Sequence, residues 1–151
     1  MKKPPLVSII LTLYEIKYEY LDKCINSILT QTYKNWELLF LDDSSKDDTV
    51  QKVLDLKAGD ERIKVFSTIF KSGPAMHLNS ALKDSRGRWV AFINCGDIWN
   101  PDKLEKQVRF MEVKGYGFSY TKFQMRSKNG VNHGTALGGK EIVTYSDKLK
   151  C

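Results

Sequence analysis

Four short apolar runs alternate with amphipathic segments over the first 114 residues, and this alternation leaves few folds open to the chain. The runs cover residues 6–11, 36–41, 63–67 and 89–93. The last is too short for a helix and has no polar alternation, which is typical of a strand covered on both faces. Strands that alternate with helices predict a largely parallel sheet with right-handed crossovers. We therefore expect an α/β protein.

The segments between the runs have helical periodicity. A first helix is expected over about residues 19–31, a second just after Thr49, and a third over about 75–84. A last one follows Asn100 as N-cap, with Pro101 at the first helical position. Their predicted inward faces are Leu21, Cys24, Ile25, Ile28 and Leu29; Val50, Val53 and Leu54; Ala75, Leu78 and Leu82; and Leu104, Val108 and Met111.

The chain changes character after Lys114. Residues 116–124 alternate loosely and predict a strand, whereas residues 127–140 are rich in glycine and polar side chains, as in a loop or hairpin. Residues 144–150 resemble the start of a helix.

Composition sets the broad class. The chain has 151 residues, 42% of them apolar, enough for one globular domain with a core. We expect neither a signal peptide nor a membrane span, and hence a cytoplasmic protein. Three cysteines (Cys24, Cys95 and Cys151) share no metal-binding spacing and predict buried or free thiols.

The formal net charge of +6 leaves two interpretations open. It suits an anionic partner such as a nucleotide, a phospholipid surface or nucleic acid. Because the basic residues are scattered, it equally suits an ordinary solvated surface.

Polar side chains follow three of the predicted strands: Thr12 and Tyr14, Asp42 and Asp43, and Asn94 and Asp97. The carboxyl ends of parallel strands share one edge of a sheet, which is where ligands bind in open α/β folds. An aromatic ring can stack on a nucleobase, and a carboxylate can accept hydrogen bonds from a base or ribose. One or two carboxylates suffice for Mg²⁺ when substrate phosphates complete its coordination.

Each of these residues also has a purely structural interpretation. Asp97 can cap a turn, Tyr14 can pack on the first helix, and Asp42 can bond backbone amides. Asp47 or Asp48 is expected to be the N-cap of the next helix. Convergence of three polar strand ends is what favours one nucleotide-diphosphate site.

Five segments resemble, in order, those of family 2 glycosyltransferases. They are V-S-I-I at 7–10 with Tyr14, S-I-L-T-Q-T-Y-K-N-W-E-L at 27–38, D-D-S-S-K-D-D-T at 42–49, Gly73 with Asn79, and G-R-W-V-A-F at 87–92 with Asp97, Ile98, Trp99 and Pro101. The resemblance covers about residues 6–110, and the ordered set is specific where no single segment is.

The resemblance implies a GT-A fold, which is Rossmann-like, and an inverting transfer of sugar from a nucleotide-diphospho-sugar donor. It implies that Thr12, Tyr14 and Asp43 contact the nucleoside and that Asp97 coordinates Mg²⁺ or Mn²⁺. It also implies one domain over 1–151, with a donor-binding core at 6–114 and an incomplete acceptor-side region at 115–151.

The chain departs from the family pattern at several positions. Thr12 replaces a proline, and Glu15 replaces an asparagine. The usual D-x-D-D corner is Asn94-Cys95-Gly96-Asp97, which lacks two acids and predicts weak metal affinity. The family usually continues well beyond this length and takes its general base from that later part. We assign no base to the late acids Glu112, Glu141 and Asp147.

Three hypotheses follow from these observations. The first is a glycosyltransferase of cell-surface polysaccharide synthesis, with a saccharide or lipid-linked acceptor, no nucleic-acid partner, and a location in the cytoplasm or at the inner face of the membrane. The second is an inactive nucleotide-binding remnant. The third is a phospho-receiver domain, suggested by the Asp42–Asp43 pair at a strand end.

Overall fold

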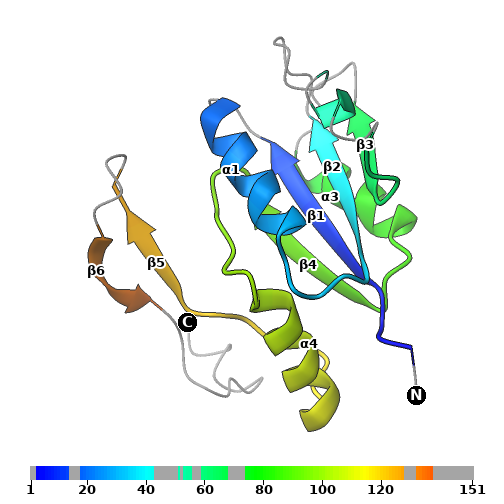
Figure 1. Ribbon diagram of the computed structural model, residues 1–151. Coiled ribbons are helices and arrows are strands. Elements are labelled where there is room, and N and C mark those ends of the chain that lie inside the picture. The colour runs from blue at the N-terminus through cyan, green and yellow to red at the C-terminus, as the bar shows by residue number, and fades with distance from the viewer. Residues whose placement is uncertain are drawn as a thin grey trace. The chain divides into compact units, whose positions relative to one another are not determined.

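The computed structural model describes residues 3–13, 18–42, 51, 53–55, 59–67, 74–127 and 132–137. The chain divides into two compact units, Met1–Lys106 and Gln107–Cys151, which we describe separately (Figure 1). Several predicted features lie outside the described residues: Tyr14, Glu15, Asp43, Asp47, Asp48, Val50, Gly73, Glu141, Asp147, Cys151 and the helix expected at 144–150.

A four-stranded parallel sheet forms the first unit, in the order β3-β2-β1-β4. Its strands are β1 (Val7–Leu13), β2 (Trp36–Asp42), β3 (Ile63–Ser67) and β4 (Trp89–Asn94). The four predicted strands and their parallel arrangement are thus confirmed. β1 and β2 are buried along almost their whole length.

The helices are α1 (Tyr18–Leu29), α3 (Pro74–Asp84) and α4 (Lys103–Lys114), with helical residues also at 51 and 53–55. From β1 to β3 the chain advances in one direction across the sheet, and it then returns to place β4 beside β1. Right-handed crossovers therefore place α1 and α3 on opposite faces, as Figure 1 shows. None of the described helices is both long and apolar enough to span a bilayer.

The core under α3 joins Ile10, Leu39, Leu41 and Ala81, with Phe66 and Leu78 packed against them. The predicted inward face of α1 is confirmed for Leu21, Cys24, Ile25 and Ile28, which are all buried, whereas Leu29 is only half-buried. On α4, Leu104, Val108 and Met111 are likewise buried.

The interpretation of β4 as covered on both faces was wrong. Phe92 is 57% exposed, and Val90 is 36% exposed. Phe92 is the in-register neighbour of Ile10 and lies on the same sheet face. That face is covered by α3, but α3 packs over β1 and β2 and leaves the β4 part open.

Three helical predictions also need correction. On α3, His77 and Ala81 are buried, whereas Ala75 and Leu82 are exposed. Leu54 is exposed as well, although Val53 is buried as predicted. Helix α4 begins at Lys103 rather than Pro101. Residues 101–102 form a turn closed by the Lys103 amide on the Asn100 carbonyl (3.0 Å), and the helical pattern starts with the bond from the Lys106 amide to the Asp102 carbonyl (3.0 Å).

The second unit contains the end of α4 and an antiparallel hairpin, β5 (Phe123–Arg126) and β6 (Asn132–Leu137). The loop or hairpin predicted over residues 127–140 is seen only in part, because β6 lies in that range but its partner β5 precedes it. The strand expected over 116–124 begins only at Phe123. Gly115, with φ 69°, ends α4, and the Tyr116 amide closes the terminus on the Met111 carbonyl (3.1 Å).

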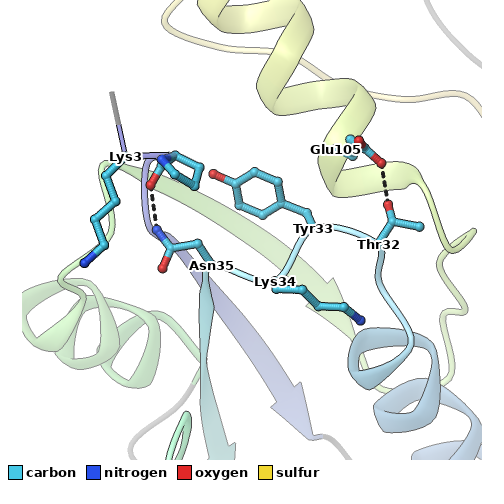
Figure 2. A pocket seen from close by; sticks show the side chains of 7 residues that line it. Lys3, Thr32, Tyr33, Lys34, Asn35 and Glu105 are labelled. Atoms are coloured by element: carbon cyan, nitrogen blue, oxygen red, sulfur yellow. Dashed lines mark hydrogen bonds between the residues drawn. The ribbon is translucent and has the colours of Figure 1, made fainter. Parts of the chain in front are cut away.

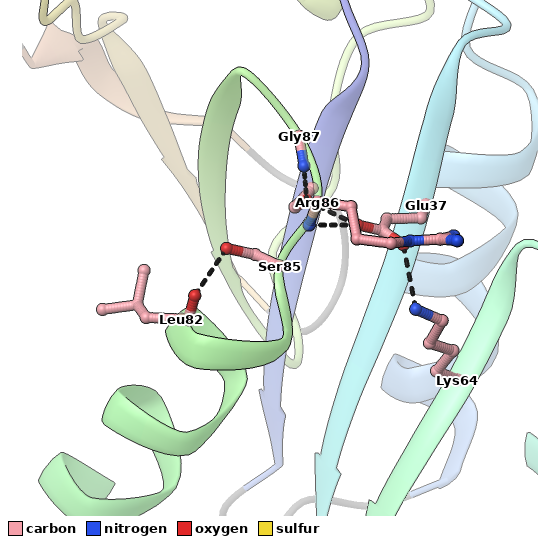
Figure 3. A network of polar contacts seen from close by, with 7 residues as sticks. Glu37, Lys64, Leu82, Ser85, Arg86 and Gly87 are labelled. Carbon is pink, nitrogen blue, oxygen red and sulfur yellow. Dashed lines mark hydrogen bonds and ion pairs between the residues drawn. The ribbon is translucent and has the colours of Figure 1, made fainter.

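A buried carboxylate joins the amino-terminal ends of three strands (Figure 3). Glu37 on β2 accepts from the Ser8 hydroxyl (2.8 Å) and from the Lys64 ammonium (3.2 Å). It also accepts from the Arg86 backbone amide (2.8 Å) and from the Arg86 guanidinium (2.8 Å for Nη2). Burial alone raises the pKa of Glu37, but these donors outweigh burial and lower the pKa to about 2.

This network predicts acid sensitivity. A carboxylate with a depressed pKa stabilises the fold above its unfolded pKa, and that stability is lost as pH falls through the folded value. We expect the free energy of unfolding of the wild type to exceed that of Glu37→Gln by about 2 kcal/mol at neutral pH. This is less than the pKa shift alone would give, because the Arg86 side chain is largely exposed and solvent screens its charge. The difference should shrink between about pH 5 and pH 2, as measured by urea unfolding. A difference that does not vary with pH would contradict this account.

Candidate nucleotide-binding site

The carboxyl ends of β1 and β4 meet where the direction of strand addition reverses. Thr12 and Asn94 are paired neighbours across the two strands. The Thr12 hydroxyl donates to Asn94 Oδ1 (3.3 Å), and the Cys95 amide donates to the Thr12 carbonyl (3.1 Å). Ligands in open α/β sheets bind at such a switch point.

The chain leaves β4 through a tight corner formed by residues 94–97, which we call the corner. The Asp97 amide donates to the Asn94 carbonyl (3.0 Å). Gly96 adopts φ 104°, a conformation that side chains disfavour, so glycine suits this position. Asp97 is exposed at the same sheet edge as Thr12.

The structure thus brings together two of the four predicted site residues, Thr12 and Asp97. The other two, Tyr14 and Asp43, follow Leu13 and Asp42 in the sequence and lie outside the described residues. Asp42 is buried, at 1% exposure. The ligand roles of all four remain predictions.

The oxygen atoms of the corner suit a cation whose coordination is completed by the phosphates of a bound substrate. Among the described residues, no group of three or more His, Cys, Asp or Glu side chains is placed to hold a metal. Asp97 offers one exposed carboxylate, and Asn94 offers an amide oxygen. Because Mg²⁺ and similar hard cations bind through one or two carboxylates plus phosphates and water, this donor set suits a metal–diphosphate complex rather than an all-protein metal site.

Two buried thiols belong to this region: Cys95 is part of the corner, and the Cys24 thiol lies 3.8 Å from the Asn94 carbonyl oxygen. Burial, with a smaller effect from Cys95, raises the pKa of Cys24 to about 12, and burial with nearby Asp97 raises the pKa of Cys95 to about 11. Both are free cysteines, as predicted. Protonated thiols are poor metal ligands, so the oxygen atoms of Asn94 and Asp97 are the better candidates for holding a cation.

Sequence reasoning missed three polar residues around the corner. Ser27 and Gln31 are buried on α1 (6% and 0% exposed). Lys103 lies 4.0 Å from the ring centroid of Trp99, and burial lowers its pKa to about 8. The sequence did offer a signal for two of these residues, because Ser27 and Gln31 are four residues apart beside the apolar face of the predicted helix.

A pocket of about 420 Å³ lies at the other end of the sheet (Figure 2). It is lined by Lys3, Pro4, Thr32, Tyr33, Lys34, Asn35 and Glu105. Its polar groups bind the protein itself: the Tyr33 hydroxyl donates to the Pro5 carbonyl, and the Asn35 amide donates to the Pro4 carbonyl (2.7 Å). It lies beside the amino-terminal ends of β1 and β2, so we do not take it as the ligand site.

Comparison with known proteins agrees with this geometry. The sequence matches the family model for glycosyl transferase family 2 over residues 8–147. It is 40% identical over 148 residues to the Escherichia coli UDP-Glc:alpha-D-GlcNAc-diphosphoundecaprenol beta-1,3-glucosyltransferase WfgD, covering 96% of this chain and 55% of that protein. It is 36% identical over 146 residues to TuaG of Bacillus subtilis, a glycosyltransferase named for teichuronic acid biosynthesis, covering 97% and 58%.

A solved structure supports the fold. The mannosyltransferase PcManGT from Pyrobaculum calidifontis, in complex with GDP-Man and Mn²⁺, superposes with a TM-score of 0.66 at 22% identity. The match covers 72% of this chain and 33% of that one.

The parallel sheet and its polar switch point define an α/β protein with the GT-A fold, as the resemblance implied. The chain belongs to glycosyl transferase family 2. It spans just over half the length of the curated relatives named above. This membership sets aside the phospho-receiver hypothesis.

Proposed function

We propose that the chain is the donor-binding part of an inverting glycosyltransferase. The enzyme would transfer a sugar from a nucleotide-diphospho-sugar to a saccharide or lipid-linked saccharide during synthesis of cell-surface polysaccharide. The observation that carries the proposal is the junction of Thr12 with the Asn94–Asp97 corner at the switch point of the sheet. The names of the relatives from E. coli and B. subtilis support the reaction class.

In this proposal, Thr12, Tyr14 and Asp43 contact the nucleoside. Asp97, helped by the Asn94 amide oxygen, holds Mg²⁺ or Mn²⁺ on the diphosphate. The cation, when bound, neutralises charge on the departing diphosphate. Gly96 lets the backbone turn so that Asp97 lies at the exposed edge. Only one acid remains in this corner, and we therefore expect modest metal affinity.

The proposed division of labour follows the chain. Residues 6–114 form the nucleotide-sugar core, and residues 115–151 belong to the acceptor side. We assign no general base: Glu112 is an exposed residue of α4, and Glu141 and Asp147 lie outside the described residues. We also propose peripheral association with the cytoplasmic face of the membrane, supported by the net charge of +6 and by the lipid-linked substrate in the name of the E. coli relative.

Calorimetric titration with UDP, GDP and dTDP, each with and without Mn²⁺, tests the donor site. We expect one of them to bind, more tightly with Mn²⁺. Thr12→Ala should weaken this binding by about threefold to tenfold, the value of one hydrogen bond. Thr30→Ala is the matched control, because Thr30 is exposed and its hydroxyl donates to the Asn26 carbonyl of its own helical turn (2.7 Å). A folded sample that binds none of the nucleotides would refute the proposal.

Turnover separates the enzyme from an inactive remnant. Hydrolysis or transfer of a sugar nucleotide by the 151-residue chain alone would exclude the remnant. Binding without turnover would leave the donor-site proposal intact and favour the inactive remnant for this chain alone.

A further inference from the structure

We infer that Ser27 and Gln31 are positioning residues that hold Asp97 in place for a metal-bound diphosphate. The inference rests on the proposed function, because it explains how Asp97, the proposed metal ligand, is held in position. It concerns residues that would touch neither nucleotide nor metal.

Both side chains are polar and buried on one side of α1 or just beyond its end. They are four residues apart, about one helical turn, and are 6% and 0% exposed. A buried hydroxyl or carboxamide costs free energy unless it is hydrogen-bonded, so their partners show what they do. Apart from two carbonyl groups of α1 itself, those partners lie in the segment that leads from the corner into α4.

Ser27 binds the chain just after Asp97. Its hydroxyl accepts from the Trp99 amide (3.1 Å) and donates to the Cys24 carbonyl of its own helix (2.7 Å). Trp99 is itself buried at 8% exposure, so both its ring and its amide are anchored.

Gln31 binds the next part of the same segment. Its Nε2 donates to the Asn100 carbonyl (2.8 Å) and to the Ser27 carbonyl (2.9 Å). Its Oε1 accepts from the Leu104 amide at the start of α4 (3.1 Å). One carboxamide therefore ties α1 to both ends of the turn that precedes α4.

The neighbouring residue completes the attachment. The Thr32 amide donates to the Pro101 carbonyl (2.8 Å), and its hydroxyl donates to Glu105 (2.6 Å), the bond drawn in Figure 2. Residues 99–105 are thus fastened to α1 and the residues that follow it at five backbone or side-chain positions, which are Trp99, Asn100, Pro101, Leu104 and Glu105.

Asp97 lies between two anchors. On one side, the Cys95 amide is bonded to Thr12 on β1 (3.1 Å); on the other, the Trp99 amide is bonded to Ser27. Only residues 96–98 span the interval, so the location of the Asp97 carboxylate depends on both anchors. Outer-shell partners that orient metal ligands commonly change metal affinity by about tenfold to a hundredfold when removed.

The test uses Gln31→Glu in the 151-residue chain, with Ile25→Val as control. Glutamate keeps the acceptor for the Leu104 amide but removes both donated hydrogen bonds. Ile25 is on the same helix and 2% exposed, so its truncation perturbs packing without touching the anchors. Ser27→Ala serves as a second variant, because it removes the partner of the Trp99 amide.

Two readouts are required. We expect amide hydrogen exchange at Trp99 and Leu104 to accelerate by about tenfold in Gln31→Glu, while amides of β1 and β2 are unchanged. We expect the Mn²⁺ enhancement of nucleotide-diphosphate affinity to fall by about tenfold, with metal-free affinity within about twofold of the wild type. Ile25→Val should match the wild type in both.

Faster exchange with an unchanged Mn²⁺ enhancement would show a merely structural role and overturn the inference. Unchanged exchange in both Gln31→Glu and Ser27→Ala would overturn it too. A wild type that binds no nucleotide, or binds without Mn²⁺ enhancement, would instead refute the proposed function or its metal component.

Discussion

Alanine at position 87 should destabilise the first unit by about 2 kcal/mol or more. A Cβ atom there would lie 2.5 Å from the Ser8 amide nitrogen, 2.7 Å from the Ser8 hydroxyl and 2.7 Å from the Trp89 carbonyl oxygen. Two of these atoms belong to the backbone of β1 and β4, so no side-chain rotation relieves the clash. The hydrogen bond from the Gly87 amide to the Ser8 hydroxyl (2.8 Å) would also be strained.

Chemical denaturation of Gly87→Ala and Gly117→Ala measures this effect. A Cβ atom at Gly117 meets no atom within 4 Å, so that control should stay within about 0.5 kcal/mol of the wild type. Equal stabilities for the two variants would show that β1 and β4 can separate at this point without cost. Because Ser8 also bonds Glu37, we further expect Gly87→Ala to reduce the acid sensitivity attributed to the buried carboxylate.

Replacing Asp97 with asparagine should reduce the Mn²⁺ enhancement of nucleotide binding by at least about tenfold. The substitution preserves shape and removes the only carboxylate of the corner. A hydrogen bond to a charged group contributes about 1.5–3 kcal/mol, and the loss of a comparable contact with the carboxylate corresponds to roughly tenfold or more in affinity. Metal-free binding should change little, because Thr12, Tyr14 and Asp43 are the proposed nucleoside contacts.

The matched control is Asp84→Asn, which makes the same charge change at an exposed residue at the end of α3. Titration of both variants with and without Mn²⁺ separates a local ligand from a general effect of charge. If both variants lose the enhancement equally, or if neither does, Asp97 is not the metal ligand.

The local sequence pattern was sufficient to predict the strands and the polar residues at their carboxyl ends. The run at 63–67 became β3 with the same bounds, because a short apolar segment between turn signals has few alternatives. Thr12 and Asp97 were identified as candidates because the carboxyl ends of parallel strands share an edge. Both lie at that edge in the structure.

The sequence by itself thus determined the alternation of strands and helices, since hydrophobic periodicity is a property of neighbouring residues. Only the tertiary structure decided the order β3-β2-β1-β4, which leaves Phe92 exposed on an apolar strand and makes His77, not Ala75, an inward residue of α3. It also decided that Ser27 and Gln31 reach backbone groups about seventy residues away. Pairing across such distances depends on how the crossovers pack, and no local pattern encodes it.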